Sequence, residues 1–506
     1  MITENDSLRR TASYTVEYVN IVLISTYELG RQPFGLASPA SWLRRRGHEV
    51  ACLDLSRQAL DESAIRAAGL IAIYLPMHTA TRLAAKLIPR LRESNPLVHV
   101  CCYGLYAPMN ADYLRTLGVR TILGGEFEHE LTQLAERLQT RLPGDDHSAV
   151  SLQPEPPVSL ERLAFEVPDR SGLPAIDKYA HLILPGGGFR LVGSTEGSRG
   201  CKHLCRHCPI VPVYKGVFRI VSRDVVIEDI RNQVAAGAQH ISFGDPDFFN
   251  GIRHAIELVR DFHREFPAVS YDVTIKIEHL RKYETHLSTL RDTGCLFVVS
   301  AVEYLDDLVL RALDKGHTRE DFLHVVRTFR ALKMILHPTF VPFTQWTTME
   351  SYLDLLRVIQ AESLIENVAP IQLGIRLLIP EGSRLLELEE VRQNVGSFDP
   401  ESLFYPWKHA DPRVDALGET VQTIAAEGDR RKESRSFVFD RIWRAAYAAA
   451  GRQAPRLHPP QEPRAAVPFL SEPWYCCAEP TREQFVSIGQ VSEKKEEPIP
   501  AGGSYV

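Results

Sequence analysis

The chain has few cysteines, no long apolar segment and no excess of basic residues. Nine cysteines in 506 residues are too few for a secreted disulfide framework, and no secretory signal pattern is present. No apolar run approaches the roughly twenty residues needed to cross a bilayer. The net charge of −6 provides no basic footprint for nucleic acid or anionic membrane. We therefore expect a cytoplasmic protein that binds neither nucleic acid nor membrane.

The length predicts several domains, because 506 residues exceed one compact core. Within residues 18–140, apolar strand-like runs alternate with helical stretches, beginning with the fully apolar run at 21–26 and the helical stretch at 37–46. This alternation predicts a doubly wound parallel sheet of the Rossmann or flavodoxin type. Such sheets bind ligands outside the carboxyl ends of their strands.

The rest of the chain divides into a linker, a second α/β region and a tail. Residues 141–175 are rich in Pro, Ser and acidic residues, which is typical of a linker. Residues 176–392 contain six strand candidates, at 189–192, 240–244, 271–276, 295–302, 334–341 and 371–378. With the intervening helices they predict a partial (β/α)6 barrel. Residues 393–506 are predicted to form a helical and irregular extension that ends in a cysteine-containing tail.

Three closely spaced cysteines, Cys201, Cys205 and Cys208, follow the first strand candidate of the second region. Three thiolates this close can hold one iron-sulfur cluster, which normally takes four thiolates, so one iron would stay open to another ligand. The preceding glycines would let the backbone wrap closely around a bulky cluster.

Two other interpretations of these cysteines use the same residues. A structural zinc site needs four ligands, and His203 or His207 could supply the fourth. Disulfides are disfavoured, because nothing in the chain resembles a secreted framework.

The spacing Cys-x-x-x-Cys-x-x-Cys after a strand resembles the loop of the radical S-adenosylmethionine (SAM) superfamily. In that family the three cysteines bind a 4Fe-4S cluster, and the amino and carboxylate groups of SAM chelate the fourth iron. The resemblance therefore implies a cluster on Cys201, Cys205 and Cys208, SAM as a second cofactor and a small-molecule substrate. It also implies a reductase, a flavodoxin or a ferredoxin as electron donor.

The same resemblance suggests residues that contact SAM. Gly244, Asp245 and Asp247 follow the second strand candidate, where relatives place backbone and acidic groups against the SAM amine. Ser300 and Glu303 close the fourth, where relatives contact the SAM carboxylate or ribose. The alternatives are that both aspartates cap the next helix and that Glu303 is a salt-bridge partner.

The order of an open α/β domain followed by the cysteine loop resembles the cobalamin-binding type of radical SAM enzyme. Residues 26–47 look like the first loop and helix of that domain, and residues 123–126 like its last strand end. An Asp-x-His-x-x-Gly motif is absent, as it often is in these relatives, so cobalamin stays a candidate cofactor. The alternative is a flavodoxin-like domain that only supports its neighbour.

The tail carries the sequence Cys-Cys-Ala-Glu-Pro at residues 476–480. It resembles the tail of the CUAEP/CCAEP radical SAM (seleno)protein subfamily. The architecture also looks like the radical SAM enzymes of arsinothricin biosynthesis, which move a 3-amino-3-carboxypropyl group from SAM to arsenic. Soft thiolates favour soft acceptors, so we predict that Cys476 and Cys477 act in catalysis by presenting trivalent arsenic. The alternative is an incidental cysteine pair.

Three hypotheses for function follow. The first is a radical SAM transferase that cleaves SAM reductively to form a carbon radical and alkylates trivalent arsenic. The second is a cobalamin-dependent radical SAM methyltransferase acting on an unactivated carbon. The third is a non-catalytic metal-binding or scaffold protein.

Overall fold

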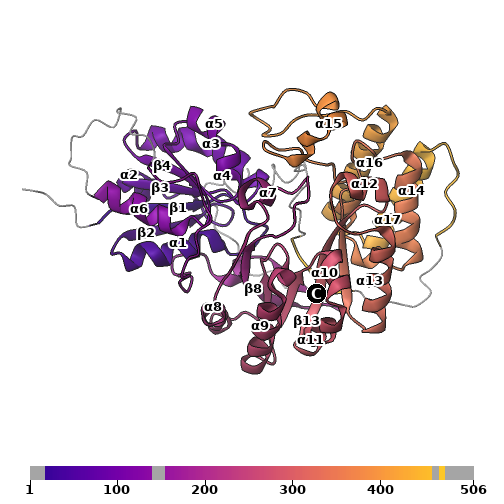
Figure 1. Cartoon of the computed structure of the whole chain (residues 1–506), viewed down its shortest axis with the longest axis horizontal. Helices are drawn as coiled ribbons and strands as arrows, with labels where there is room; N and C mark the ends of the chain where they lie inside the picture. The colour runs from indigo at the N-terminus through magenta and orange to yellow at the C-terminus, as the bar shows by residue number, and fades with distance from the viewer. Residues whose placement is uncertain (1–17, 140–153, 458–466, 473–506) are drawn as a thin grey trace, which may run out of the picture.

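The computed structural model describes residues 18–139, 154–457 and 467–472. These residues form two α/β sheets in sequence order, followed by a helical carboxy-terminal region. Figure 1 shows the first sheet in indigo and purple at one end of the molecule and the helical region in orange at the other. The predicted fold class is confirmed.

The first sheet is parallel throughout, with the strand order β2-β1-β3-β4-β5-β6. Its strands are β1 (Asn20–Ser25), β2 (Glu49–Asp54), β3 (Leu70–Tyr74), β4 (His99–Tyr103), β5 (Thr121–Gly125) and β6 (Val158–Ser159). Side chains alternate between the faces of a strand. On β1, Val22 and Ile24 enter one buried cluster while Ile21 and Leu23 enter another. Both faces are therefore covered, which explains why this strand is apolar along its whole length.

Helices supply these two covering layers. They are α1 (Phe34–Arg45), α2 (Glu62–Ala67), α3 (His78–Ser94), α4 (Tyr106–Met109), α5 (Ala111–Thr116) and α6 (Glu128–Gln139). Leu36 of α1 and Leu131 of α6 join the cluster that contains Ile21, while Ile88 of α3 joins the cluster that contains Val22. This two-sided arrangement leaves the carboxyl ends of the strands as the open edge of the sheet.

The second sheet is a curled half-barrel with the order β14-β13-β12-β11-β8-β7-β15. Its strands are β7 (His181–Ile183), β8 (Phe189–Thr195), β11 (His240–Phe243), β12 (Ser270–Thr274), β13 (Cys295–Glu303), β14 (Ile335–Phe340) and β15 (Phe469–Leu470). Five strands, from β8 to β14, run parallel, whereas β7 and β15 pair antiparallel at one edge.

The sixth parallel strand expected at residues 371–378 does not form as predicted. A 3-10 helix, Pro370–Leu373, takes its first half, and a single parallel bridge joins Phe343 to Arg376. Pro370 has no N–H to give to a ladder and its φ suits the start of a helical turn. This position of the half-barrel is thus held by one bridge.

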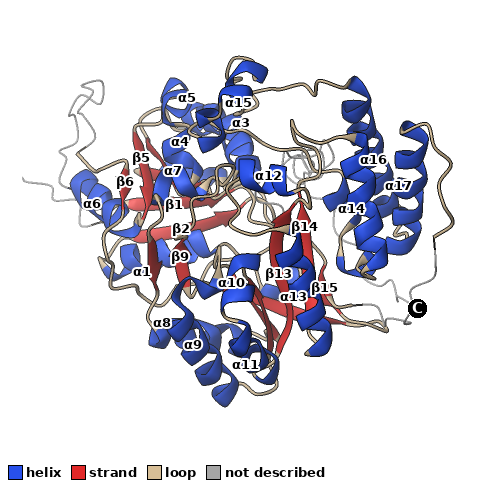
Figure 2. Ribbon diagram, turned by 45° about the vertical axis from the view of Figure 1, so that its right-hand side comes forward, coloured by secondary structure: helices blue, strands red, loops and turns tan. Residues whose placement is uncertain are grey.

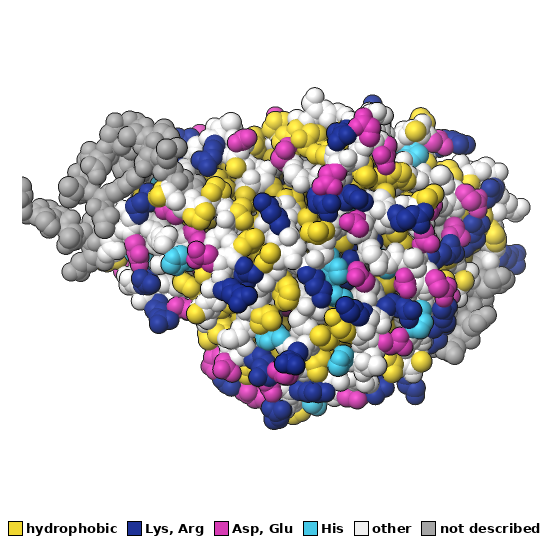
Figure 3. Space-filling view, in the orientation of Figure 1, with side chains coloured by type: hydrophobic (Ala, Val, Ile, Leu, Met, Phe, Trp, Pro, Cys, Tyr) yellow, Lys and Arg dark blue, Asp and Glu magenta, His cyan; other side chains and the backbone are white. Residues whose placement is uncertain are grey.

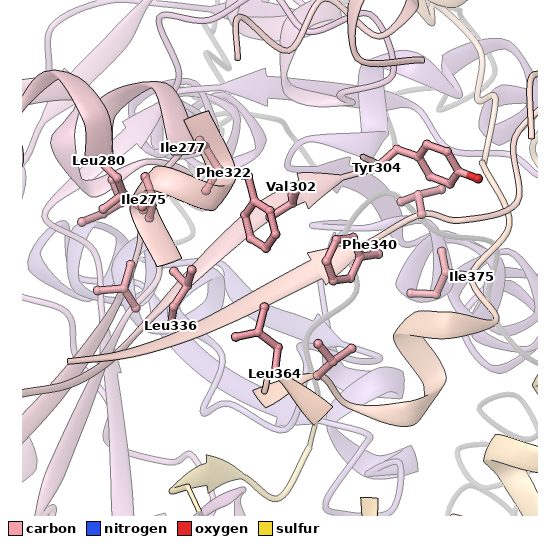
Figure 4. Close-up of a cluster of buried hydrophobic side chains, with 14 of the residues drawn as sticks. Ile275, Ile277, Leu280, Val302, Tyr304, Phe322, Leu336, Phe340, Leu364 and Ile375 are labelled. Carbon is pink, nitrogen blue, oxygen red and sulfur yellow. The ribbon is translucent and has the colours of Figure 1, made fainter. Parts of the chain in front are cut away.

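The helices of the half-barrel follow its strands. They are α8 (Arg223–Ala235), α9 (Ile252–Glu265), α10 (Ile277–Lys282), α11 (Leu287–Asp292), α12 (Asp307–Ala312), α13 (Arg319–Ala331) and α14 (Met349–Ala361). Figure 4 shows how Phe322 of α13 packs among Val302, Leu336 and Phe340 of the last two parallel strands. Thr318 caps α13 in a capping box with Asp321, as its sequence predicts.

The carboxy-terminal region adds α15 (Glu389–Asn394), α16 (Pro412–Arg430) and α17 (Arg435–Ala449), of which the last two pack side by side (Figure 2). The chain then returns as β15 to the edge strand β7. Glu472 ends the described residues, accepting a hydrogen bond from Tyr27 (2.7 Å) and pairing with Arg57 (3.2 Å). The start of the tail is therefore anchored at the carboxyl edge of the first sheet.

On the face shown in Figure 3, basic and acidic side chains are interspersed. No helix in the described ranges combines the length and hydrophobicity of a bilayer-crossing segment.

Candidate functional site

The cysteine loop follows β8 and lies, with α7 (Ile210–Tyr214), between the two strands of an antiparallel hairpin, β9 (Ser198–Gly200) and β10 (Phe218–Ile220). Gly200 has φ +71°, which L side chains rarely adopt. A Cβ atom there would lie 2.3 Å from the Tyr214 ring and 2.6 Å from the Val217 carbonyl oxygen. Only glycine fits at the turn into Cys201.

The three cysteines of the loop are withdrawn from solvent together. Cys205 is buried and Cys201 and Cys208 are half-buried, and no disulfide links the cysteines of the described ranges to one another. Burial, together with the smaller effect of the nearby Asp247 and Cys208 charges, raises the pKa of Cys201 to about 12. Burial likewise raises the pKa of Cys205, although Lys315 and Lys276 oppose the effect. Thiols that repel one another as thiolates become stable when they share a positive metal centre, so this donor set fits an iron-sulfur cluster.

Hydrogen bonds from distant segments fix the backbone of the loop. Asn250 accepts a hydrogen bond from the Lys202 amide (3.3 Å) and donates one to the Gly200 carbonyl (3.4 Å). Arg384 donates to the Leu204 carbonyl (2.6 Å). Sequence reasoning missed both anchors. Asn250 lies close to the predicted Asp245 and could have been found there, but nothing local marks Arg384.

Asp245, predicted to contact SAM, holds the loop that enters the hairpin. Its carboxylate accepts hydrogen bonds from the Gly197 amide (2.8 Å) and the Ser198 hydroxyl (2.6 Å). Burial raises its pKa to about 7 against these hydrogen bonds. The carboxylate does not cap a helix, and the neighbouring Gly244 lines a cavity described below.

Asp247 both caps a helix and faces the cysteine loop. Its Oδ1 accepts from the Phe249 amide (3.2 Å) at the start of the 3-10 helix Phe248–Gly251. Its Oδ2 lies 3.3 Å from His203 Nε2 and 2.6 Å from His279 Nδ1. The expected capping role is present, but the second oxygen belongs to a group of histidines that sequence reasoning missed.

Glu303 ends β13 with φ +69° and is fully enclosed. It pairs with His207 Nε2 (3.1 Å) and Lys315 Nζ (3.1 Å). Burial opposes the charge of Glu303, but the Lys315 charge and the hydrogen bond with His207 lower its pKa to about 2. Glu303 is therefore a salt-bridge partner, as the alternative interpretation expected. Its partner His207 belongs to the cysteine loop.

Other polar groups near this position lack partners. Ser300 Oγ and both ring nitrogens of His317 are buried and make no hydrogen bond within the described part of the chain. Burial is the main cause that lowers the pKa of His317 to about 3, and the nearby charges of Lys315 and Lys276 lower it in the same direction. The His317 ring is therefore neutral. Buried polar groups of this kind usually bind a ligand or water. The remaining predicted site residues, Cys476 and Cys477, lie outside the described residues.

A cavity of about 130 Å³ separates the open edge of the first sheet from the cysteine loop. Its walls include Phe34, Tyr74 and Gly104 from the first sheet and Glu196, Gly200 and Gly244 from the half-barrel. Sites for drug-sized ligands typically measure about 300–1,000 Å³, and cobalamin is larger than such ligands. In this arrangement the residues do not fit cobalamin, although the position suits a ligand of the first sheet.

A buried ion cluster closes the cavity on one side. Arg199, two residues before Cys201, lies 3.3 Å from Glu126, 2.6 Å from Glu128 and 2.8 Å from Glu196. Glu126 also accepts from Tyr214 (3.2 Å). Two of these carboxylates follow β5 of the first sheet, so the ion cluster ties that sheet to the cysteine loop.

A curled parallel sheet with three clustered thiols at the end of its first parallel strand defines a metal-dependent α/β enzyme. Residues 195–356 match the sequence model of the Radical SAM superfamily. The chain is a radical SAM enzyme, with a 4Fe-4S cluster and SAM as its implied cofactors. The non-catalytic alternative is therefore wrong. No curated protein sequence matches the chain.

Solved structures similar in fold are cobalamin-dependent radical SAM enzymes. OxsB with aqua-cobalamin and SAM bound aligns with a TM-score of 0.63 and 14% identity, covering 81% of this chain and 67% of OxsB. The radical SAM methyltransferase TsrM from Kitasatospora setae, with tryptophan and a SAM analogue, aligns with a TM-score of 0.56 and 16% identity, covering 75% and 79%. At this identity the likeness concerns the fold alone.

Proposed function

We propose that Cys201, Cys205 and Cys208 hold the 4Fe-4S cluster and that SAM is bound beside it and cleaved reductively to a carbon radical. The observation that carries this proposal is the position of three withdrawn thiols at the carboxyl end of β8, inside the segment that matches the superfamily. When bound, the cluster supplies one electron to SAM, delivered by a reductase, a flavodoxin or a ferredoxin.

The protein's own residues position the cofactors and exclude water. Gly244, Asp245 and Asp247 are proposed to border the SAM amine, and Ser300 and Glu303 its carboxylate or ribose. Support comes from their places at the ends of β11 and β13 and from the unpartnered Ser300 hydroxyl. Because Asp245 and Glu303 already hold neighbouring residues, we propose that they shape this site mainly through Ser198 and His207.

For the substrate, we propose transfer of a 3-amino-3-carboxypropyl group from SAM to trivalent arsenic held by Cys476 and Cys477. A carbon–sulfur bond of SAM breaks, a carbon–arsenic bond forms and methylthioadenosine leaves. Arsenic(III) that takes up the carbon radical loses one further electron to reach arsenic(V), and this electron offsets the one that cleaved SAM, so no net electron is consumed. The thiolate chemistry of the tail supports the arsenic step. So does Glu472, which anchors the start of the tail at the edge facing the cavity.

Anaerobic turnover with SAM, dithionite and arsenite tests this assignment. We expect an organoarsenical and methylthioadenosine, analysed by liquid chromatography and mass spectrometry. Cys476→Ser and Cys477→Ser should lose the organoarsenical but retain iron, while Cys295→Ala, a buried cysteine on β13, should keep both. Unchanged product from both tail variants would remove the tail from catalysis. Deoxyadenosine in place of methylthioadenosine would show that a different SAM bond is cleaved.

The second candidate is cobalamin-dependent methylation of an unactivated carbon, supported by the likeness in fold to OxsB and TsrM. The small cavity between the sheets argues against it. Cobalt analysis after reconstitution with hydroxocobalamin decides between the candidates. One cobalt per chain would favour methylation, and cobalt-free enzyme that still cleaves SAM would remove it.

A further inference from the structure

Three side chains beside the cysteine loop place metal-ligating atoms together. His203 lies between Cys201 and Cys205, Asp247 follows β11, and His279 lies on α10 after β12. One ligating atom from each residue lies within 4.8 Å of the other two. The side chains are 11%, 2% and 1% exposed, respectively, so water satisfies them little. We name this set the His-Asp-His group.

The geometry of the group favours a shared ligand over direct hydrogen bonds. Asp247 Oδ2 lies 2.6 Å from His279 Nδ1 and 3.3 Å from His203 Nε2. Yet within the described residues none of these three atoms makes a hydrogen bond. Ligand bonds of about 2.0–2.2 Å place neighbouring donors about 3 Å apart around one ion, and the two distances bracket that spacing.

The surroundings of the group also resemble those of a metal site. Glu278 Oε2 lies 3.4 Å from Nδ1 of His203, the ring nitrogen that faces away from the group. Metal-ligating histidines commonly give their second N–H to a carboxylate in this way. Asp247 is oriented by the Phe249 amide on Oδ1, which leaves Oδ2 to the group. Both oriented ligands thus present their unsatisfied atom to the same point.

We propose that the His-Asp-His group binds one divalent first-row transition-metal ion, iron(II) or zinc(II), separate from the cluster on the three cysteines. Two imidazoles and one carboxylate are donors that both ions accept, and three protein ligands leave open positions. The ion would tie the cysteine loop to the ends of β11 and β12.

Metal analysis of the reconstituted full-length enzyme tests the proposal. Wild-type enzyme should contain about one metal ion per chain beyond the four irons of its cluster, either a fifth iron or one zinc. His279→Gln and Asp247→Asn should lose that ion and keep the four cluster irons. His324→Ala is the matched control, since His324 also pairs with a carboxylate, Glu284 (2.8 Å), but belongs to no three-donor group of the described chain.

Two further measurements cover the case in which a variant fails to load its cluster. A Cys201→Ala/Cys205→Ala/Cys208→Ala variant should lose the cluster irons but retain about one ion. X-ray absorption at the edge of that metal should show only nitrogen and oxygen neighbours, which also distinguishes iron from zinc. Wild-type enzyme with four irons and no other ion would overturn the proposal, as would an extra ion that persists in both His279→Gln and Asp247→Asn. In either case the group is a metal-free set of polar contacts.

Discussion

Glu126 lies where the first sheet contacts the cysteine loop, at the ion cluster around Arg199 that we call the junction. Its carboxylate shares Arg199 with Glu128 and Glu196 and accepts one hydrogen bond from Tyr214. One guanidinium cannot neutralise three enclosed carboxylates. Burial, only partly opposed by Arg199, accordingly raises the pKa of Glu126 to about 7. Glu126→Gln keeps the shape and removes the charge that this site disfavours; its amide oxygen can accept from Arg199 while its amide N–H donates to the Tyr214 oxygen.

The size and sign of the expected change in stability follow from the pKa of Glu126 in the unfolded chain and in the folded protein. A pKa that rises from 4.5 in the unfolded chain to about 7 in the fold corresponds to about 3 kcal/mol. Between these values the folded protein holds a proton that the unfolded chain releases, so this contribution falls as the pH rises and is fully lost above pH 7. Glu126→Gln should exceed the stability of wild type by less than about 1 kcal/mol at pH 5 and by up to about 3 kcal/mol at pH 8.

Urea unfolding at pH 5 and pH 8, followed by circular dichroism on the reconstituted enzyme, measures this difference. Glu128→Gln provides the contrast, because Glu128 accepts short hydrogen bonds from Ser38 (2.6 Å) and Arg199 (2.9 Å). That variant should be less stable than wild type at both pH values. If Glu126→Gln proves less stable than wild type at pH 8, ionised Glu126 contributes more to the junction than its burial costs, and the reasoning is refuted.

Three further changes test other parts of the site. Glu303→Gln leaves Lys315 enclosed without its carboxylate and should cost about 3–5 kcal/mol at pH 7 in urea unfolding. With the pKa of Glu303 near 2, wild type should lose part of this advantage as the pH falls from 4.5 towards 2; an equal deficit across that range would contradict the pairing. Cys201→Ala should abolish cluster loading and SAM cleavage, measured by iron and nucleoside analysis, whereas Cys295→Ala should retain both; retained iron in the first variant would exclude Cys201 as a ligand. Thr318→Ala removes the cap of α13 and should lower stability by about 1 kcal/mol in thermal unfolding without changing iron content.

The fold was largely predictable because its signals are local. The fully apolar β1 and the Thr318 cap depend on periodicity and short-range hydrogen bonds, which a sequence displays directly. The cysteine loop was recognisable for the same reason. The expected sixth strand failed at Pro370, where a turn preference outweighed an apolar run.

The partners of the site residues were not predictable in the same way. Asp245 binds the hairpin entry, and Arg384 reaches the loop from 180 residues away. Which carboxylate pairs with which cation depends on the tertiary packing of distant segments, not on the local spacing of residues. The sequence therefore predicted positions by strand end, but the contacts of Asp247 with His203 and His279 required the folded chain.

The ion cluster at the junction affects both the space available for cobalamin and the position of the cysteine loop. Arg199 stands two residues before Cys201, and its guanidinium also lies over the rings of Phe127 (5.5 Å) and Phe165 (4.8 Å). A cofactor large enough to fill the edge of the first sheet would have to displace Arg199 or its partner Glu196, since both line the cavity. Displacing them would release the strand that delivers the first cysteine. Cobalamin and the ion cluster around Arg199 would therefore need the same space, and in this structure the ion cluster lies there.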